Sequence, residues 1–357
     1  MTDEQFIRRT LLLAAKARGK TSPNPMVGAV LVKKGRVIAE DYHRKAGTPH
    51  AEALVIGKAG DKARGATLYV NLEPCCHTEK RTPPCTREIV RAGIGKVVVA
   101  MKDPNPRVSG RGLAELEGAG IETLSGILED RARRLNEAYV AYITTGKPFV
   151  TLKVAMTLDG KIATPDGESK WITGEKARKY VHRVRSGVDA LLTAIGTVKA
   201  DNPLLTARVP GGKDPVRIVI DPNLEVPPDA HVLRTPPPTI LVTRARGERS
   251  DALAEAGIEI LRYEDTLDLR WLMEELGKRH MTSVLIEGGS SLAAHALEDG
   301  VVDKVLFFIA PKIIGGKDSY PAVGGRTFRR IGEAHRVKDV SVRRFGEDLL
   351  IEGYVAK

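Results

Sequence analysis

One histidine, two cysteines and one glutamate have a spacing that could support metal-assisted hydrolysis. They are His50 and Glu52, with one residue between them, and Cys75 and Cys85, of which Cys75 follows a proline. An imidazole and two thiolates can bind zinc and leave a fourth coordination position for water, which is typical of a catalytic rather than a structural site. Two thiolates neutralise the dication, so a bound hydroxide can form near neutral pH.

Glu52 is the catalytic candidate of this set. It stands two residues after His50 at the expected start of a helix, and it would not be a metal ligand. A carboxylate in this place could move a proton from the water to a departing amine. A His-x-Glu pair followed by Pro-Cys is the signature of zinc deaminases, in which the activated water attacks an amine-bearing ring carbon.

Two other interpretations stay open from the spacing alone. These residues could be ordinary members of an α/β core, although the complete set is much rarer than one His with one Cys. Alternatively, Cys76 or His77 could supply a fourth ligand and close the site as a structural zinc centre. Adjacent side chains usually diverge, so the sequence favours Cys76 as a small packing residue.

Helical and strand patterns alternate through the first part of the chain. They predict helices over 4–18, 51–59, 84–92, 112–119 and 129–143, and strands over 27–33, 37–43, 67–72, 96–100 and 121–124. This order predicts a layered α/β domain. In it, His50 precedes a helix, Cys75 follows a strand and Cys85 opens a helix.

A second α/β series follows the punctuation at Gly146 and Pro148. We therefore expect one domain over 1–145 and another over 146–357. The strands expected in the second domain are 149–156, 189–194, 216–220, 239–243, 258–262, 283–287, 304–310 and 348–355, with helices between several of them.

The chain resembles, over nearly its whole length, the bifunctional deaminase/reductase family of bacterial riboflavin biosynthesis. In the first part the resemblance rests on Pro23-Asn24-Pro25-Met26-Val27-Gly28, His43, Gly47-Thr48-Pro49-His50-Ala51-Glu52, Leu72-Glu73-Pro74-Cys75, Arg81-Thr82-Pro83-Pro84-Cys85 and Asp103-Pro104-Asn105-Pro106. Nine residues separate Cys75 from Cys85, whereas nucleic-acid and cytidine deaminases have Pro-Cys-x-x-Cys. Family members more often have eight, so this loop is one residue longer.

The resemblance implies a cytidine-deaminase-like three-layer α/β/α fold for 1–145, a zinc-dependent pyrimidine deaminase domain. His50, Cys75 and Cys85 would hold one Zn²⁺, and Glu52 would be the proton shuttle. The implied substrate is a diaminopyrimidinone that carries a phosphoribosylamino group. The residues implied in binding this substrate are Asn24, His77, Lys80 and Thr82.

The second part resembles the reductase domain of the same family, which is similar to dihydrofolate reductase. The matching stretches are 153–161, 167–173, 196–208 and 287–292. Gly288 and Gly289 also have a meaning of their own, because glycines between a strand and a helix let a pyrophosphate approach backbone N–H groups. They do not form a Rossmann fingerprint, since the pattern Gly-x-Gly-x-x-Gly is missing.

This second resemblance implies a dihydrofolate-reductase-like α/β fold for 146–357 and NADPH-dependent hydride transfer to the ribose C1′, which turns a ribosylamino group into ribitylamino. The implied cofactor-binding residues are Ala155, Trp171, Thr197, Asp201, Gly289, Ser290, Ser291, Leu292 and Ala293. The implied substrate-binding residues are Ser169, Arg185, Leu205, Arg208 and Glu287. Asp201 and Glu287 are weak candidates for a general acid.

Composition limits the partners of this chain. Its 357 residues, 42% hydrophobic and 28% charged, suit a globular protein of two domains. The net charge of +11 suggests an anionic partner, and phosphoribosyl pyrimidines with NADPH account for part of it. A nucleic-acid or nucleoside zinc deaminase with an accessory domain is the alternative, but aromatic residues are only 4% and the basic residues are scattered, so we expect no nucleic acid.

We also expect no membrane partner and a cytoplasmic location. The longest apolar runs fall far short of the roughly 20 residues of a spanning helix, and the first five residues, Met1-Thr2-Asp3-Glu4-Gln5, are not a basic signal region. A non-enzymatic zinc-stabilised binding module would leave the motifs of the second part unexplained. The family resemblance implies a homo-oligomer, a dimer or tetramer, formed through the reductase domain.

Overall fold

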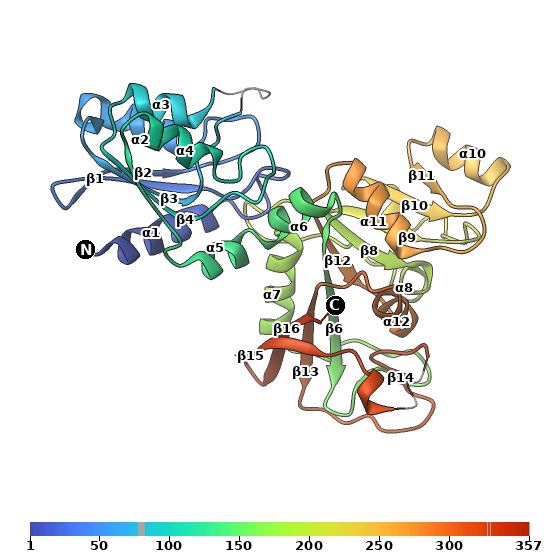
Figure 1. The fold of residues 1–357 in the computed structure, drawn as a ribbon. Helices are drawn as coiled ribbons and strands as arrows, with labels where there is room; N and C mark the ends of the chain where they lie inside the picture. The colour runs from blue at the N-terminus through green and yellow to red at the C-terminus, as the bar shows by residue number, and fades with distance from the viewer. Residues whose placement is uncertain (78–82, 327, 329, 357) are drawn as a thin grey trace. The chain divides into compact units, whose positions relative to one another are not determined.

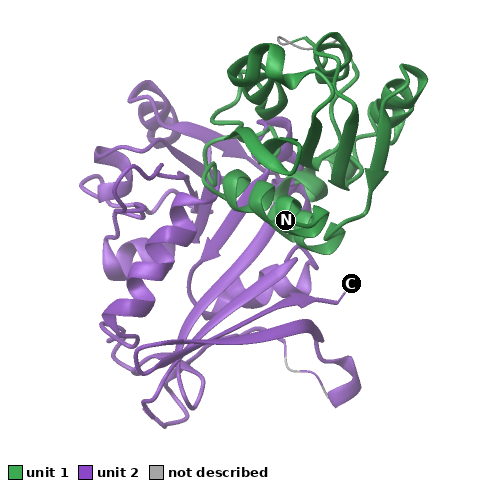
Figure 2. Ribbon diagram, turned by 90° about the vertical axis from the view of Figure 1, so that its left-hand side faces the viewer, with its two compact units in different colours: residues 1–147 green, residues 148–357 purple. Residues whose placement is uncertain are grey.

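The chain divides into two compact units in the computed structural model, which describes residues 1–77, 83–326, 328 and 330–356 (Figure 1, Figure 2). Unit 1 is Met1–Lys147 and unit 2 is Pro148–Lys357. Each unit has its own sheet and its own buried apolar clusters. No helix in the described part of the chain combines the length and the apolar character needed to cross a membrane.

Unit 1 contains a five-stranded sheet in the order β2-β1-β3-β4-β5. The strands are β1 (Gly28–Lys33), β2 (Arg36–Tyr42), β3 (Thr67–Leu72), β4 (Lys96–Met101) and β5 (Glu122–Ser125). Strand β1 is antiparallel to β2 and β3, whereas β3, β4 and β5 are parallel. The helices are α1 (Asp3–Ala15), α2 (Ala51–Ala59), α3 (Cys85–Arg91), α4 (Arg111–Gly118), α5 (Glu129–Leu135) and α6 (Glu137–Thr145), with a 3-10 turn at Gly60–Ala63.

Helices cover both faces of this sheet and make three layers (Figure 1). Helices α2, α3 and α4 pack on one face through residues such as Val55 and Ile89. Helices α1, α5 and α6 contribute residues such as Phe6 to the cluster on the other face. Successive strand residues point to opposite faces, so Val97 and Val98 belong to different clusters. Burial on both faces explains why these strands read as continuous apolar runs.

The single helix expected over 129–143 is two helices, because the chain turns at Asn136. The buried amide of Asn136 accepts a hydrogen bond from Met26 N at 2.8 Å and donates one to Met26 O at 3.0 Å. These bonds hold Asn136 at φ −104° and ψ 24°, outside helical geometry. The apolar spacing continues across the turn, so it could not reveal the break.

Unit 2 contains a nine-stranded sheet in the order β11-β10-β9-β8-β12-β6-β13-β16-β15. The strands are β6 (Phe149–Thr157), β8 (Ala190–Ala194), β9 (Val216–Ile220), β10 (Thr239–Thr243), β11 (Glu259–Arg262), β12 (Ser283–Glu287), β13 (Lys304–Ala310), β15 (Val337–Phe345) and β16 (Asp348–Val355); β7 (Lys161–Ala163) and β14 (Tyr320–Pro321) form a separate pair. The helices are α7 (Glu175–Ser186), α8 (Ile195–Asp201), α9 (His231–Arg234), α10 (Glu248–Glu255), α11 (Leu269–Lys278) and α12 (Ser290–Glu298), with a 3-10 turn at Ile331–Glu333.

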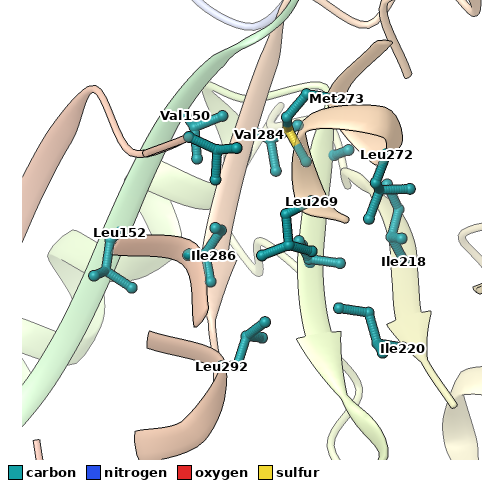
Figure 3. Packing of buried hydrophobic residues seen from close by; sticks show 14 of the residues in the cluster. Val150, Leu152, Ile218, Ile220, Leu269, Leu272, Met273, Val284, Ile286 and Leu292 are labelled. Atoms are coloured by element: carbon teal, nitrogen blue, oxygen red, sulfur yellow. The ribbon is translucent and has the colours of Figure 1, made fainter. Parts of the chain in front are cut away.

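The seven strands from β11 to β13 are parallel, and the antiparallel β16 and β15 extend one edge. Figure 3 shows the main core, in which Leu269 and Leu272 of α11 and Leu292 of α12 pack against strand residues such as Ile218 and Ile286. A second cluster, with α8, covers the opposite face. Helix α7 packs on β13 and β16 in a third cluster.

Strand β15 and the β7–β14 pair were not predicted from the sequence. Eight of the nine residues of β15 are exposed, including Val340 at 54% and Val342 at 60%. A strand prediction depends on one or two buried faces, and β15 buries neither face within the chain. The β7 and β14 strands have three and two residues, which is too short for any periodicity.

Arg217 of β9 is a buried cation, 1% exposed, whose hydrogen-bond partners among the described residues are neutral oxygens. They are Thr239 Oγ1, Thr235 Oγ1 and the carbonyl oxygens of Leu204, His231, Thr235 and Pro237. Burial lowers the pKa of Arg217 to about 10. The guanidinium thus joins β9 to the loop before it and to the segment that leads into β10.

We predict that Arg217→Met lowers the free energy of unfolding of unit 2 by about 3 kcal/mol, because several buried oxygens lose their donor. Both tryptophans, Trp171 and Trp271, belong to unit 2, so tryptophan fluorescence during urea unfolding reports this unit alone. Arg246→Met is the control, since the ion pair of Arg246 with Glu264 is exposed and should contribute less than about 1 kcal/mol. Equal effects of the two changes would contradict the role of Arg217.

Candidate metal centre and cofactor site

The structure brings the three predicted zinc ligands together in unit 1. His50 is the residue before α2, Cys75 follows β3, and Cys85 is the first residue of α3. His50 Nδ1 lies 3.5 Å from Cys75 Sγ and 3.2 Å from Cys85 Sγ, and the two sulfur atoms are 3.3 Å apart. These residues form a group able to hold a metal ion, and Cys76 is not part of it.

The donor set fits zinc. Tetrahedral bonds of about 2.3 Å to sulfur and about 2.0 Å to nitrogen place neighbouring ligand atoms roughly 3.5–3.8 Å apart. The separation of His50 Nδ1 from Cys75 Sγ matches this range and the other two separations are shorter, so small side-chain shifts suffice to hold the ion. Three protein ligands leave one position for water or substrate, which matches a catalytic site.

Glu52 lies in the first turn of α2, close to this cluster in sequence and in space. The side chain is buried, and Glu52 Oε2 has no hydrogen-bond partner among the described residues. Burial raises the pKa of Glu52, although the neighbouring imidazole of His50 acts in the opposite direction. A buried carboxyl group with one oxygen unengaged can take up and release a proton beside the metal site.

Asn24, predicted to bind substrate, is connected to the metal cluster through His43. Asn24 Nδ2 lies 3.3 Å from His43 Nε2, and His43 Nδ1 donates to Pro49 O at 3.1 Å. The ring of His43 meets the ring of His50 edge-on, with centroids 5.2 Å apart, so His43 links Asn24 to a metal ligand. In the sequence His43 is recognisable only as a motif residue, and this contact was not predicted.

His77 follows the two adjacent cysteines and is half-buried, whereas Lys80 and Thr82 lie outside the described residues. A cavity of about 520 Å³ borders the cluster, lined by His50 and Cys85 together with residues of α2 and α3 such as Lys58 and Glu88. This volume suits a small molecule.

In unit 2, most of the predicted cofactor residues lie at the carboxyl ends of three neighbouring parallel strands, β8, β12 and β6. Ala155 is near the end of β6, and Thr197 and Asp201 are on α8, directly after β8. Gly289 is the N-cap of α12, and residues 290–293 form its first turn, after β12. Open α/β sheets bind ligands at this edge.

The N-terminus of α12 suits a phosphate group. Its first backbone N–H groups have no acceptor within the helix, so an anion can accept from them. Ser290 Oγ is buried there and has no hydrogen-bond partner in the described part of the chain. These features fit a nicotinamide dinucleotide, whose pyrophosphate needs such donors.

Trp171 is the aromatic member of the predicted cofactor set, and it is exposed. Its side chain is 62% exposed, and the guanidinium of Arg178 lies 4.5 Å from the centre of its ring. Lys170, the residue before it, forms an ion pair with Asp201 at 3.0 Å. The structure therefore brings the segment of Trp171 to the end of α8, where the predicted residue Asp201 lies.

Glu287 is buried at the end of β12 and pairs with two cations. Arg185 binds it through two hydrogen bonds of 2.7 and 3.0 Å, and Lys153 Nζ lies 3.2 Å from Glu287 Oε2. Burial alone would raise the pKa of Glu287, but Arg185 and Lys153 outweigh it and hold this pKa well below its ordinary value. The pairing favours a fixed charge over a proton donor.

Thr206 gathers three basic side chains near this ion pair. Its carbonyl oxygen accepts from His182 Nδ1 at 3.2 Å and from Arg185 Nη1 at 3.1 Å. Its hydroxyl accepts from Arg208 Nε at 3.3 Å. The neighbouring Leu205 is buried, and Ser169 is half-buried in the loop between β7 and α7.

Lys153 and His182 were not among the predicted site residues. A signal for Lys153 exists, because it is the one charged residue in the apolar strand β6. His182 stands three residues before Arg185 on α7, a spacing that places two residues on the same helix face.

Two protein-family models match the chain. The cytidine and deoxycytidylate deaminase zinc-binding region matches residues 1–101, and the RibD C-terminal domain matches residues 148–351. Together they imply a zinc ion in the first part and a nicotinamide cofactor in the second. They confirm the two fold types predicted from the sequence.

Curated relatives and solved structures agree with these matches. The riboflavin biosynthesis protein RibD of Aquifex aeolicus is 46% identical, over 98% of this chain and 97% of the relative. RibD of Escherichia coli is 38% identical, over 98% and 99%. The structure of Acinetobacter baumannii RibD has a TM-score of 0.91 at 37% identity and covers 99% of both chains.

The structure of a diaminohydroxyphosphoribosylaminopyrimidine deaminase/5-amino-6-(5-phosphoribosylamino)uracil reductase from Thermotoga maritima has a TM-score of 0.89 at 37% identity, again over 99% of both chains. Full-length identity, both family models and both structures point the same way. The chain therefore belongs to the RibD family, the bifunctional deaminase/reductases of riboflavin biosynthesis.

Proposed function

We propose that this chain catalyses two consecutive steps. The first is hydrolytic deamination of a diaminopyrimidinone that carries a phosphoribosylamino group, and the second is NADPH-dependent reduction of the ribosyl group of the resulting aminouracil to ribityl. The observation that carries the proposal is the cluster of His50, Cys75 and Cys85 with Glu52 buried beside it. The Thermotoga maritima protein, similar over the full length, is named for both activities.

Each step is assigned to one part of the chain, deamination to 1–145 and reduction to 146–357. The division into compact units at Lys147 and Pro148 supports this assignment. The family matches support it too, because the zinc-binding region ends at residue 101 and the reductase region begins at residue 148.

In the deamination, His50, Cys75 and Cys85 would hold zinc, which would supply an activated water when bound. Glu52 takes a proton from that water and delivers it to the departing amine, so that a C–O bond forms, the C–N bond breaks and ammonia leaves. Asn24 binds the edge of the pyrimidine, and its hydrogen bond with His43 fixes the amide for that task. His77, Lys80 and Thr82 are assigned to the ring or the phosphate.

In the reduction, the residues of 146–357 would align NADPH with the ribose C1′, and the cofactor would supply the hydride when bound. The assigned cofactor residues are Ala155, Trp171, Thr197, Asp201 and Gly289–Ala293. Substrate is assigned to Ser169, Arg185, Leu205, Arg208 and Glu287. The basic side chains around Thr206 support a phosphate at this place, because a dianion needs cationic donors.

A homo-oligomer formed through unit 2, a dimer or tetramer, completes the proposal together with a cytoplasmic location. The exposed valines of the edge strand β15 support the homo-oligomer, since exposed apolar side chains on an edge strand favour association. The three cysteines support the cytoplasmic location, because none of them forms a disulfide bond among the described residues.

Supplying the phosphoribosylamino-diaminopyrimidinone with and without NADPH tests both activities. We expect ammonia release from zinc-loaded protein without NADPH, and NADPH oxidation only after the deaminated product exists. Absence of ammonia release would refute the proposed deamination. NADPH oxidation at full rate on the undeaminated substrate would refute the proposed order of the steps.

We predict that Glu52→Gln lowers the rate of deamination at least about 100-fold, because the amide cannot carry the proton. The variant protein should retain zinc. Ammonia release and the zinc content of the purified protein are the measurements. Glu4→Gln, the same change on the exposed first turn of α1, is the control and should leave the rate unchanged. Deamination that survives in the Glu52 variant would exclude Glu52 as the proton shuttle.

We predict that Arg208→Met raises the KM of the reductase by about tenfold or more and leaves deamination intact, since a charged hydrogen-bond donor to the phosphate is lost. Steady-state NADPH oxidation with the deaminated substrate measures it. Arg246→Met, an exposed arginine of the same unit, should behave as the wild type. Loss of both activities in the Arg208 variant would contradict two separate sites.

We predict that Val342→Glu shifts the protein toward monomer, because a charge among the exposed valines of β15 opposes association. Sedimentation over a range of concentrations measures the change. Leu12→Glu on α1, where the leucine is 72% exposed, is the matched change in unit 1 and should have no effect on assembly. An unchanged sedimentation coefficient for Val342→Glu would exclude β15 from the interface.

A further inference from the structure

Glu73 is a buried carboxylate between the end of β3 and the ligand Cys75. Each of its oxygens accepts two backbone hydrogen bonds. Glu73 Oε1 accepts from the N–H groups of Gly112 at 2.9 Å and Leu113 at 3.2 Å, and Glu73 Oε2 accepts from those of Asp103 at 3.1 Å and Gly110 at 2.9 Å. The side chain therefore joins the segment of Cys75 to the whole stretch between β4 and α4.

Two of these donors belong to the first turn of α4. The first N–H groups of a helix have no acceptor within the helix, and the helix dipole favours a negative charge at this end. The N-cap of α4 is Gly110, at φ 86°, which has no side chain to cap the helix. Glu73, 37 positions earlier in the chain, takes over that role.

Gly112 gives a second, independent indication that α4 and the Cys75 segment must stay in close contact. A Cβ atom at Gly112 would lie 2.2 Å from the carbonyl oxygen of Pro74 and 3.1 Å from Glu73 Oε1. Only glycine allows the first turn of α4 to approach the peptide that immediately precedes the metal ligand.

The backbone on both sides of Cys75 is also held. Glu73 N donates to Met101 O at 3.0 Å and continues the β3–β4 pairing, while Thr86 N donates to Cys75 O at 3.3 Å. Thr86 Oγ1 donates to Glu115 Oε1 of α4 at 2.9 Å. The segments of both ligand cysteines are thus attached to the same helix.

We propose that Glu73 is a positioning residue of the metal site. It fixes the Pro74–Cys75 backbone against α4, so that Cys75 Sγ already lies beside His50 Nδ1 and Cys85 Sγ before a metal ion binds. Glu73 touches neither ion nor substrate and acts through Cys75. This inference rests on the proposed zinc site.

A carboxylate is required at this position because four N–H donors face it. Glutamine has one acceptor oxygen, and its amide group would direct N–H donors at two of the four backbone N–H groups. Buried donors without an acceptor are unfavourable, so the loop 103–113 and the Cys75 segment would separate.

The test compares the zinc affinity of the wild type, Glu73→Gln and Tyr69→Phe in the full-length chain by competition with a chelator. Outer groups that orient metal ligands typically contribute roughly 10–100-fold to metal affinity, and we expect a loss of this size in Glu73→Gln. The visible spectrum of the cobalt-substituted protein should change as well, because the geometry at Cys75 changes. Tyr69 lies in the same strand β3 and donates a hydrogen bond to Asp3 of α1. Tyr69→Phe removes this bond and should keep the wild-type affinity for zinc.

The outcomes separate this inference from the proposed function. If the wild type binds no zinc, or binds it equally well without Cys75, the proposed zinc site is wrong. If the wild type binds zinc and Glu73→Gln has the same affinity and cobalt spectrum, the positioning role is refuted.

Reduction of the deaminated substrate by unit 2 shows that the variant chain is folded there. If unit 1 does not fold in Glu73→Gln, the zinc affinity of Glu73→Asp is measured instead. This change keeps the negative charge but shortens the side chain by one methylene, which moves the carboxylate away from the backbone N–H donors. Weaker zinc binding by Glu73→Asp supports the positioning role, and unchanged binding overturns it.

Discussion

Four backbone N–H groups converge on the carboxylate of Glu73, and the metal-ligand cluster lies beside this meeting point. The bonds determine where β3 stops, where α4 starts and how closely the two approach. Three ligand atoms from separate segments can stand within 3.5 Å of one another only if the backbone between them is held in this way. The chemistry proposed for unit 1 therefore depends on a residue that takes no part in it.

Unit 2 uses buried charge in a comparable manner. Glu287 at the end of β12 is held by Arg185 and Lys153. Arg185 also donates to Thr206 O, and His182 and Arg208 bind Thr206 too. Arg217 bonds to carbonyl oxygens of distant segments, including Leu204 in the loop that leads to Thr206. Glu287 and Arg217 are both buried with several hydrogen-bond partners, which offsets the cost of placing a charge beside an apolar sheet.

The elements around the zinc ligands could be predicted because their sequence carries local signals. Strand 67–72 and helix 51–59 match the structure residue for residue, since both have a buried apolar face. The turn at Asn136 escaped prediction because its cause, a pair of bonds to Met26, lies 110 residues away. Glu73 and His182 escaped for the same reason, since their partners are distant in sequence, and β15 escaped because it buries no face within the chain.

We expect zinc to have three protein ligands in unit 1, with Glu52 outside the coordination shell. Anomalous X-ray scattering at the zinc edge from crystals of the zinc-loaded protein measures this most directly. We expect one anomalous peak per chain within bonding distance of His50 Nδ1, Cys75 Sγ and Cys85 Sγ, with the Glu52 carboxylate not coordinated. A peak bonded to Cys76 or Glu52, or the absence of a peak at this cluster, would contradict it.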